Sequence, residues 1–229
     1  MTMTAIITGA SSGIGKAIAY KLAKKKMNVV LVARSKDRLE AIQEDINKKR
    51  NGKALAIPVD ITDKNAVAEM VSLAKKTFGH IDVLVNNAGV MLDAAVTNGQ
   101  LSDWEQMVDV NIKGLLYGLH EVIPDMTANK QGHIINIASV SGIEVTKKST
   151  VYSATKFAVR AVSMGLEKEL AHTGVKVTNI SPGMVDTSLT DRSVMKRKPL
   201  DAENIADAVY YCISEPSHVN VNEITIRPV

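Results

Sequence analysis

Short runs rich in valine, isoleucine and leucine alternate with longer amphipathic runs along the whole chain, and this alternation limits the possible folds more than any other feature. The β-rich runs are residues 5–8, 28–33, 54–59, 83–86, 133–138, 176–180 and 223–226. The runs between them have helical periodicity and cover residues 14–26, 35–49, 64–78, 102–126, 152–171 and 202–214. Nearly continuous apolar strands are expected where both faces of a sheet are covered. Short connections between such strands and helices predict right-handed crossovers and a parallel sheet.

The alternation therefore predicts an α/β protein with one Rossmann-type, doubly wound domain over residues 1–229, about seven parallel strands and helices on both faces. No repeat, low-complexity tract or linker marks a second domain. Ligands of such sheets bind at the carboxyl ends of the strands. The polar, basic segment 184–200 follows a predicted strand at this edge, so it is either a lid over a substrate or an ordinary surface loop.

Composition excludes several other classes of protein. No apolar run approaches the roughly 18–20 residues of a membrane span, and the first residues lack the basic region of a signal peptide. Cys212 is the only cysteine, which excludes an internal disulfide and most cysteine metal sites, and the histidines show no metal-ligand spacing. We therefore expect a cytoplasmic protein that uses neither a membrane nor a metal.

The net charge of +4 invites comparison with nucleic-acid-binding proteins. However, the basic residues lie in scattered pairs and triplets, most of them at helix ends or in loops. Aromatic residues make up only 3% of the chain, so stacking platforms for bases are scarce. We expect a small-molecule ligand and no nucleic acid.

The segment TGASSGIGKAIA directly follows the first predicted strand and opens a helix. Gly9 permits a tight exit from the strand, Gly13 lets backbone approach a pyrophosphate, and Gly15 allows close packing of the helix. Backbone N–H groups at a helix start favour an anion, and serine hydroxyls add donors. The spacing differs from G-x-G-x-x-G, so an ordinary glycine-rich turn is the alternative. The predicted cofactor contacts here are Gly9, Ser11, Ser12, Gly13, Ile14 and Gly15.

The end of the second predicted strand indicates which cofactor binds. NAD sites generally place an acidic residue there to hold the ribose hydroxyls, but this chain has Ala33 followed by Arg34 and Ser35. A guanidinium can pair with a 2′-phosphate in a bidentate, charge-assisted hydrogen bond. The sequence thus predicts NADP(H) rather than NAD(H), with a solvated helix-start arginine as the alternative.

The stretch TVYSATKFAVR places Tyr152 and Lys156 four residues apart in a predicted helix, on one face. Such pairs also arise by chance, with the tyrosine in a core or at its edge and the lysine in solvent. The spacing alone does not separate a structural pair from one in which the ammonium acts on the phenol.

The segments TGASSGIG, VDITD, NNAG, INIAS, YSATK and SPGMVDT, with Asn111 between them, occur in an order and at spacings that resemble the short-chain dehydrogenase/reductase family. The correspondence runs from about residue 5 to residue 187. The resemblance implies a nicotinamide-dependent oxidoreductase. It also implies a homo-oligomer, a tetramer or a dimer, formed through the helices predicted at 102–126 and 152–171.

The resemblance also assigns residues to the two halves of the cofactor. Those on the adenine and ribose side are Asp60, Ile61, Asn87, Ala88 and Gly89. Those around the nicotinamide half are Pro182, Gly183, Val185 and Thr187. From the residues alone, Asp60 can instead belong to a helix cap, and the SPG segment can be only a turn.

Four residues carry the implied chemistry. A ketone that gains hydride becomes an alkoxide and needs a proton, which Tyr152 would donate, but a free tyrosine with a pKa of about 10 is a sluggish acid–base group. The Lys156 ammonium and a positive nicotinamide would stabilise the phenolate and lower that pKa. Ser139 would polarise the carbonyl. The resemblance adds that Lys156 binds the nicotinamide ribose and that Asn111 holds a water between Lys156 and solvent.

The C-terminal segment EPSHVNVNEITIRPV resembles the NADP-dependent 3-hydroxy acid dehydrogenases that oxidise serine and allo-threonine, and clavulaldehyde-type reductases share much of the pattern. We therefore predict a small carbonyl compound and its secondary alcohol as substrates, with 3-hydroxy acids as one candidate class. Acyl-thioesters and other ketones or aldehydes are alternatives. An NADP-binding sensor without turnover is a further alternative, although the intact Ser139, Tyr152 and Lys156 favour an enzyme.

Overall fold

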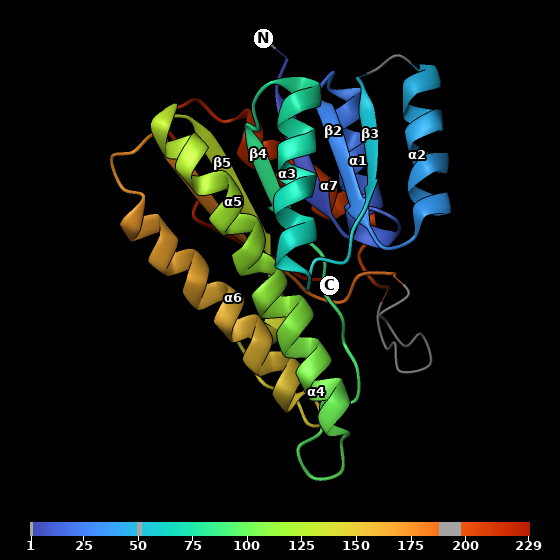
Figure 1. The fold of residues 1–229 in the computed structure, drawn as a ribbon. Helices are drawn as coiled ribbons and strands as arrows, with labels where there is room; N and C mark the ends of the chain where they lie inside the picture. Colours follow the sequence, from blue (N-terminus) through green and yellow to red (C-terminus); the bar gives the residue numbers. More distant parts are fainter. Residues whose placement is uncertain (1, 50–51, 188–197) are drawn as a thin grey trace.

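The computed structural model describes residues 2–49, 52–187 and 198–229. In this part of the chain, seven parallel strands form one sheet in the order β3-β2-β1-β4-β5-β6-β7 (Figure 1). The strands are β1 Thr4–Thr8, β2 Asn28–Ala33, β3 Ala54–Pro58, β4 Val83–Asn86, β5 Gly132–Ile137, β6 Val175–Pro182 and β7 Glu223–Ile226. The predicted doubly wound sheet is confirmed, and every predicted strand lies within two residues of its observed ends.

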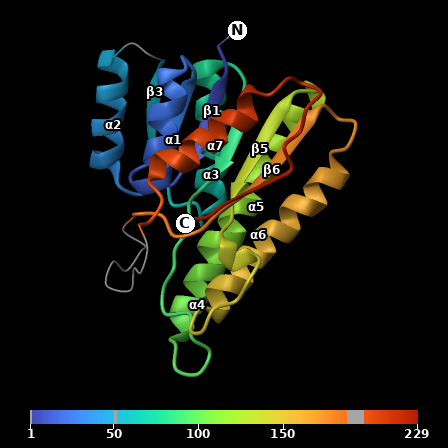
Figure 2. The same cartoon turned by 180° about the vertical axis from the view of Figure 1, so that it is seen from behind.

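Helices cover both faces of the sheet. They are α1 Gly13–Lys24, α2 Lys36–Lys49, α3 Lys64–Phe78, α4 Leu101–Val108, α5 Gly114–Ala128, α6 Thr150–Glu169 and α7 Ala202–Ser214. Helices α3, α5 and α6 lie in front of the sheet in Figure 1, and Figure 2 shows α1, α2 and α7 on the opposite face. Alternate residues of one strand enter the two cores: Val83 and Val85 pack on the side of α1 and α7, and Leu84 on the side of α3 and α5.

The single helix predicted over residues 102–126 was wrong in one respect. A π-helical turn, Asp109–Lys113, separates α4 from α5. The buried side chain of Asn111 in this turn forms two hydrogen bonds with the backbone of Val90, at 2.8 and 3.0 Å. Because a π-turn accommodates one extra residue in a helix, it lets Asn111 reach this backbone without ending the helix.

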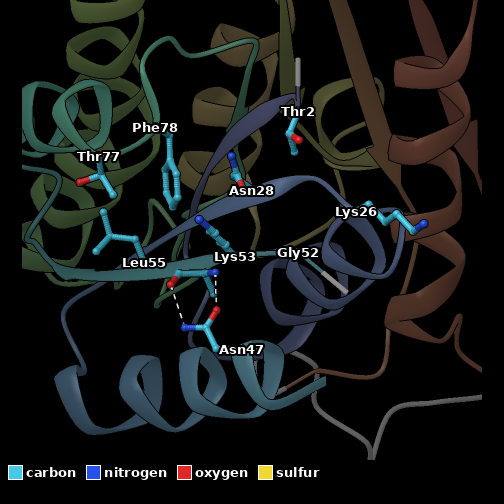
Figure 3. Close-up of a pocket in the computed structure, with 10 residues that line it drawn as sticks. Thr2, Lys26, Asn28, Asn47, Gly52, Lys53, Leu55, Thr77 and Phe78 are labelled. Atoms are coloured by element: carbon cyan, nitrogen blue, oxygen red, sulfur yellow. Dashed lines mark hydrogen bonds between the residues drawn. The ribbon is translucent and has the colours of Figure 1, made fainter. Parts of the chain in front are cut away.

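The edge strand β3 is protected by side chains of α2. Asn47 pairs with both backbone groups of Ala54, at 2.8 and 3.2 Å, and Gln43 accepts a hydrogen bond from the Ala56 N–H at 2.6 Å. Figure 3 shows the Asn47 pair at the rim of a pocket of about 670 Å³. Since free backbone groups on an edge strand invite pairing with another chain, these amides satisfy part of that edge. The pocket is lined by residues at the amino ends of β1, β2 and β3.

The strand order reverses between β1 and β4, and the carboxyl ends of all the strands meet at one edge of the sheet. The C-terminus also lies at this edge (Figure 1). Doubly wound sheets bind ligands outside the carboxyl ends, at the reversal point. Of the helices described, none combines enough length and apolar character to cross a bilayer.

Candidate functional site

The turn after β1 needs glycine at three positions for three different reasons. Gly9 has φ +68°, and a Cβ atom there would lie 2.8 Å from Nδ2 of Asn87. Gly13 has φ +51°, and its Cβ would lie 3.1 Å from Cγ2 of Thr187. A Cβ at Gly15 would collide with the carbonyl oxygen of Gly9. The turn therefore lies against both the segment after β4 and the segment after β6.

The N-terminus of α1 opens from this turn. Ser12 is the N-cap residue, and its hydroxyl makes no capping hydrogen bond to the helix in the part of the chain described. Ser11 and Ile14 are half-buried beside it, while Ser12 is exposed. Because the Ser12 side chain leaves the first N–H groups of α1 uncapped, this end of the helix can accept an anionic group.

Thr8, which sequence reasoning missed, connects β1 to the segment after β4. Its buried hydroxyl accepts the N–H groups of Asn87 and Ala88, each at 3.0 Å, and donates to the Val85 carbonyl at 3.3 Å. The Asn87 side chain donates to the Thr8 carbonyl at 2.9 Å. A buried hydroxyl at the end of a strand needs hydrogen-bond partners. The position of Thr8 at the end of an apolar strand, just before Gly9, was therefore the sequence signal that could have identified it.

The residues predicted to discriminate between cofactors follow β2, and those predicted beside the adenine follow β3. Arg34 is exposed directly after β2, and the Ser35 carbonyl accepts the first backbone hydrogen bond of α2. Hydrogen bonds from Thr62 lower the pKa of Asp60, and the charge of Arg34 contributes to the same shift. Asp60 therefore shapes a turn, and it is Asp63 whose side chain caps α3. Arg34 adds positive charge to a strand end where NAD sites have an acidic residue.

Ile61 is buried after β3 and packs on α5. A Cβ atom at Gly114, the first residue of α5, would lie 2.6 Å from Cδ1 of Ile61. This contact fixes the segment that carries Asp60 and Ile61 against the helix that follows the π-turn.

Ser139 and Tyr152 meet at the carboxyl end of β5. Ser139 lies two residues after the buried end of that strand and Tyr152 lies in the first turn of α6, where Ser139 is near enough to the phenol to lower its pKa. The Ser139 hydroxyl also accepts the Ser141 N–H at 3.1 Å. Two hydroxyl groups side by side at the strand edge can bind one oxygen atom of a ligand.

Lys156 lies one helical turn after Tyr152 and is 6% exposed. Its Nζ atom donates to the Ile137 carbonyl at 3.0 Å and lies 5.8 Å from the centre of the Tyr152 ring. Burial lowers the pKa of Lys156 from 10.5 to about 8. The ammonium is thus held between the end of β5 and the aromatic ring.

The expected effect of Lys156 on Tyr152 does not dominate. The pKa of Tyr152 is raised above 10, because burial disfavours the phenolate, and the Ser139 hydrogen bond opposes this shift only in part. Lys156 bonds the Ile137 carbonyl rather than the phenol oxygen, and it is not among the causes of the shift. Tyr152 consequently carries its proton near neutral pH, as a proton donor must.

Asn111 and Lys156 face each other across Gly89. A Cβ atom at Gly89 would lie 3.3 Å from Oδ1 of Asn111 and 3.4 Å from Nζ of Lys156. The Asn111 amide also donates to the Thr155 hydroxyl at 3.0 Å, so it joins the segment after β4 to α6. Since Oδ1 accepts one hydrogen bond from Val90, it keeps a second lone pair for another donor.

The segment after β6 completes the edge. Gly183 donates to the Ile226 carbonyl at 2.7 Å, and Val185 forms a parallel bridge with Leu200. This bridge joins the two ends of the predicted loop 184–200, of which residues 188–197 lie outside the described residues. Pro182 ends β6, and Thr187 contacts Gly13 across the sheet edge. All predicted site residues are therefore at one edge of the sheet, remote from the pocket in Figure 3.

Comparisons with known proteins agree with this geometry. A sequence model of the family described as "short chain dehydrogenase" matches residues 3–198. An uncharacterised oxidoreductase of Staphylococcus saprophyticus is 54% identical over 226 residues, which cover 98% of this chain and 97% of that protein.

Solved structures extend the likeness to the fold. The closed form of a serine dehydrogenase complexed with NADP+ is 31% identical, with a TM-score of 0.91 over 98% of this chain and 94% of that one. An alcohol dehydrogenase from the archaeon Thermococcus sibiricus, complexed with 5-hydroxy-NADP, is 29% identical, with a TM-score of 0.91 over 100% of this chain and 97% of that one.

Proposed function

Because the chain belongs to the short-chain dehydrogenase family, we propose that it is an NADP(H)-dependent oxidoreductase that interconverts a small carbonyl compound and its secondary alcohol. The observation that carries this proposal is the group formed by half-buried Ser139, half-buried Tyr152 and buried Lys156 at the carboxyl end of β5. Each of the three has a contact that suits it to proton transfer at a carbonyl oxygen.

The residues around the α1 N-terminus fit a dinucleotide. Gly9 and Gly13 have the positive φ values of a tight turn, and the N-cap residue Ser12 makes no side-chain capping bond to α1 in the described chain. Arg34 would pair with a 2′-phosphate, and no carboxylate at position 33 opposes it. NADPH would supply the hydride when bound, and the protein side chains would supply the proton and the hydrogen bonds to the substrate oxygen.

The mechanism assigns one task to each side chain. Ser139 donates a hydrogen bond to the substrate oxygen, and Tyr152 transfers its proton to that oxygen as negative charge develops. Lys156, charged below a pH of about 8, stabilises the phenolate that remains. Asn111 holds a water over Gly89, through which the lost proton is replaced from solvent.

We infer 3-hydroxy acids as the first substrate class to test. The resemblance of the C-terminal segment supports this class, and a serine dehydrogenase is among the similar structures. The segment 184–200 is the proposed substrate loop, since its two ends are joined beside Pro182 and Gly183.

We further propose a cytoplasmic homo-oligomer, a tetramer or a dimer, that associates through α5 and α6. These helices expose large apolar side chains, namely Leu116, Phe157 and Met164. Apolar side chains on neighbouring helices are typical of surfaces that another subunit covers.

A turnover screen tests the proposal. Purified protein is mixed with NADPH or NADP+ and with 3-hydroxy acids, aldehydes, diketones and acyl-thioesters, and the absorbance of NADPH is followed. We expect NADPH-linked turnover in the wild type and a loss of more than about 100-fold in Tyr152→Phe, with NADPH affinity retained. Turnover of Tyr152→Phe within about tenfold of wild type would refute the role of Tyr152 as the proton donor. NADPH binding without turnover of any substrate would instead identify a sensor.

A further inference from the structure

A row of polar residues crosses the sheet at the same level on four adjacent strands. Asn86 of β4 is in register with Asn136 of β5, Asn136 with Asn179 of β6, and Asn179 with Glu223 of β7. Residues in register on parallel strands point to the same face of the sheet. The residues two positions earlier on β4, β5 and β6 belong to the apolar core on the α5 and α6 side, so the row faces these helices.

Buried amides in a parallel sheet are costly unless they are hydrogen-bonded. The three asparagines are at most 5% exposed. Asn86 donates to Asn136 at 2.9 Å, and Asn136 donates to the Ser163 hydroxyl of α6 at 2.8 Å. Ser163 in turn donates to the Val159 carbonyl at 2.8 Å, so the helix backbone itself is part of the connection.

The outer end of the row also contacts α6. Arg160 forms a two-pronged ion pair with Glu223, at 2.9 and 3.1 Å, and Asn179 donates to the same carboxylate at 3.4 Å. The side chains of this ion pair are about one-third exposed. The row thus runs from the centre of the sheet to its surface and contacts the helix at two of its positions.

These contacts lie on the same stripe of α6 as Lys156, on its C-terminal side. Asn136 precedes Ile137, whose carbonyl binds the Lys156 ammonium at 3.0 Å. Lys156, Arg160 and Ser163 follow one another at intervals of four and three residues, which places them on one stripe of α6. An α-helix rises about 1.5 Å per residue, so the attachment at Ser163 is about 10 Å along the axis from Lys156. The hydrogen bond of Lys156 to the Ile137 carbonyl and that of Ser163 to Asn136 are thus well separated along the helix, and together they oppose sliding or rolling of α6 on the sheet.

We propose that Asn136, Ser163, Arg160 and Glu223 are positioning residues, which set the register of α6 on the sheet and thereby the place of Tyr152 and Lys156 relative to Ser139. This inference rests on the proposed oxidoreductase function. A displacement of about 1 Å at reacting groups can lower a rate by about 100-fold, so a modest shift of α6 has a measurable effect on kcat.

Ser163→Ala tests the inner attachment, because it removes the acceptor for Asn136 and adds no bulk. We expect kcat to fall by about tenfold or more, NADPH affinity to stay within about threefold, and the fall of kcat at high pH to shift. A lower melting temperature with kcat and its pH profile unchanged would show a purely structural contact and overturn the proposal.

The Arg160–Glu223 ion pair supplies a second test, which remains possible if Ser163→Ala folds poorly. Arg160→Glu and Glu223→Arg should each lower kcat by about threefold, and the double variant should restore it. The matched control is the ion pair of Lys75 with Asp125 at 2.7 Å, which joins α3 to α5, and Lys75→Glu should leave kcat unchanged. Wild-type kcat in both single variants at α6 would contradict the positioning role.

A crystal structure of Ser163→Ala separates this inference from the proposed function. If the wild type turned over no substrate, the proposed function would fail, but the distance between Lys156 and the Ile137 carbonyl would still report the position of α6. Loss of that hydrogen bond, or a shift of α6 by about 0.5 Å or more, supports the row as the device that holds the helix. An unchanged helix refutes it.

Discussion

Replacing Lys156 by methionine should stabilise the protein while it removes the activity. The ammonium is 6% exposed, and burial lowers its pKa from 10.5 to about 8. At about 1.4 kcal/mol per pKa unit, holding the proton in the folded protein costs about 3 kcal/mol near pH 7. Methionine has a similar length and no charge, so it fills the same space without this cost.

The gain is smaller than the full cost, because methionine cannot donate to the Ile137 carbonyl. Leaving a buried acceptor without its partner costs about 1–2 kcal/mol. The free energy of unfolding should therefore rise by about 1–2 kcal/mol, which for a chain of this size raises the melting temperature by about 2–8 °C.

The sign of the pH dependence gives a second check. The folded pKa lies below the unfolded one, so the cost of the charge is fully present below a pH of about 8 and disappears as the pH rises towards 10.5. The advantage of Lys156→Met should thus be largest near neutral pH and shrink at higher pH. Urea unfolding at several pH values measures it, with Lys168→Met, an exposed position on the same helix, as the control. A variant no more stable than wild type near pH 7, or an advantage independent of pH, would refute the reasoning.

Three further outcomes are expected. Arg34→Asp should change the ratio of kcat/KM for NADPH over NADH by about tenfold or more in favour of NADH, because it replaces a phosphate partner by a charge that repels phosphate. Gly89→Ala should lower kcat by about tenfold with the fold retained, since its methyl group would lie 3.3 Å from Asn111 Oδ1 and 3.4 Å from Lys156 Nζ. Alcohol oxidation should accelerate as the pH rises, because Tyr152 with its raised pKa must first lose a proton, whereas carbonyl reduction should slow above a pH of about 8 as Lys156 loses its charge. Initial rates with NADPH and NADH measure the first, the kcat of the variant beside wild type the second, and initial rates of oxidation and reduction over a pH series the third.

The strands and the doubly wound parallel sheet could be predicted from the sequence because hydrophobic periodicity is a local signal. The glycines of the first turn could be predicted for a similar reason: each has a backbone task that follows from a tight turn between a strand and a helix. The π-turn at Asn111 could not, because one extra residue leaves the apolar pattern of a long helix almost unchanged. The π-turn is explained by the contact of Asn111 with Val90, and this contact joins residues more than twenty positions apart in the sequence.

The electrostatics of the site also escaped prediction. The family resemblance implied that the Lys156 ammonium lowers the pKa of the Tyr152 phenol, but burial acts in the opposite direction and is the largest cause of the shift. Burial depends on which elements cover a side chain, and the sequence does not give this directly. The row from Asn86 to Glu223 was missed for the same reason, since its members come from four strands and only the register brings them to one level.

The row of polar residues from Asn86 to Glu223 also bears on how Lys156 stays buried. A lysine with its charge in a dry site gains free energy if its ammonium reaches water, and its long side chain allows this as soon as the helix rolls. Asn136 and Glu223 hold α6 at Ser163 and Arg160, beyond Lys156 on the same stripe, and so oppose that roll. If this reasoning is correct, Ser163→Ala lets Lys156 approach solvent, and its pKa rises from about 8 towards 10.5. The fall of the reduction rate at high pH should then move to higher pH in Ser163→Ala, and a shift to lower pH would contradict the link between the row and the lysine.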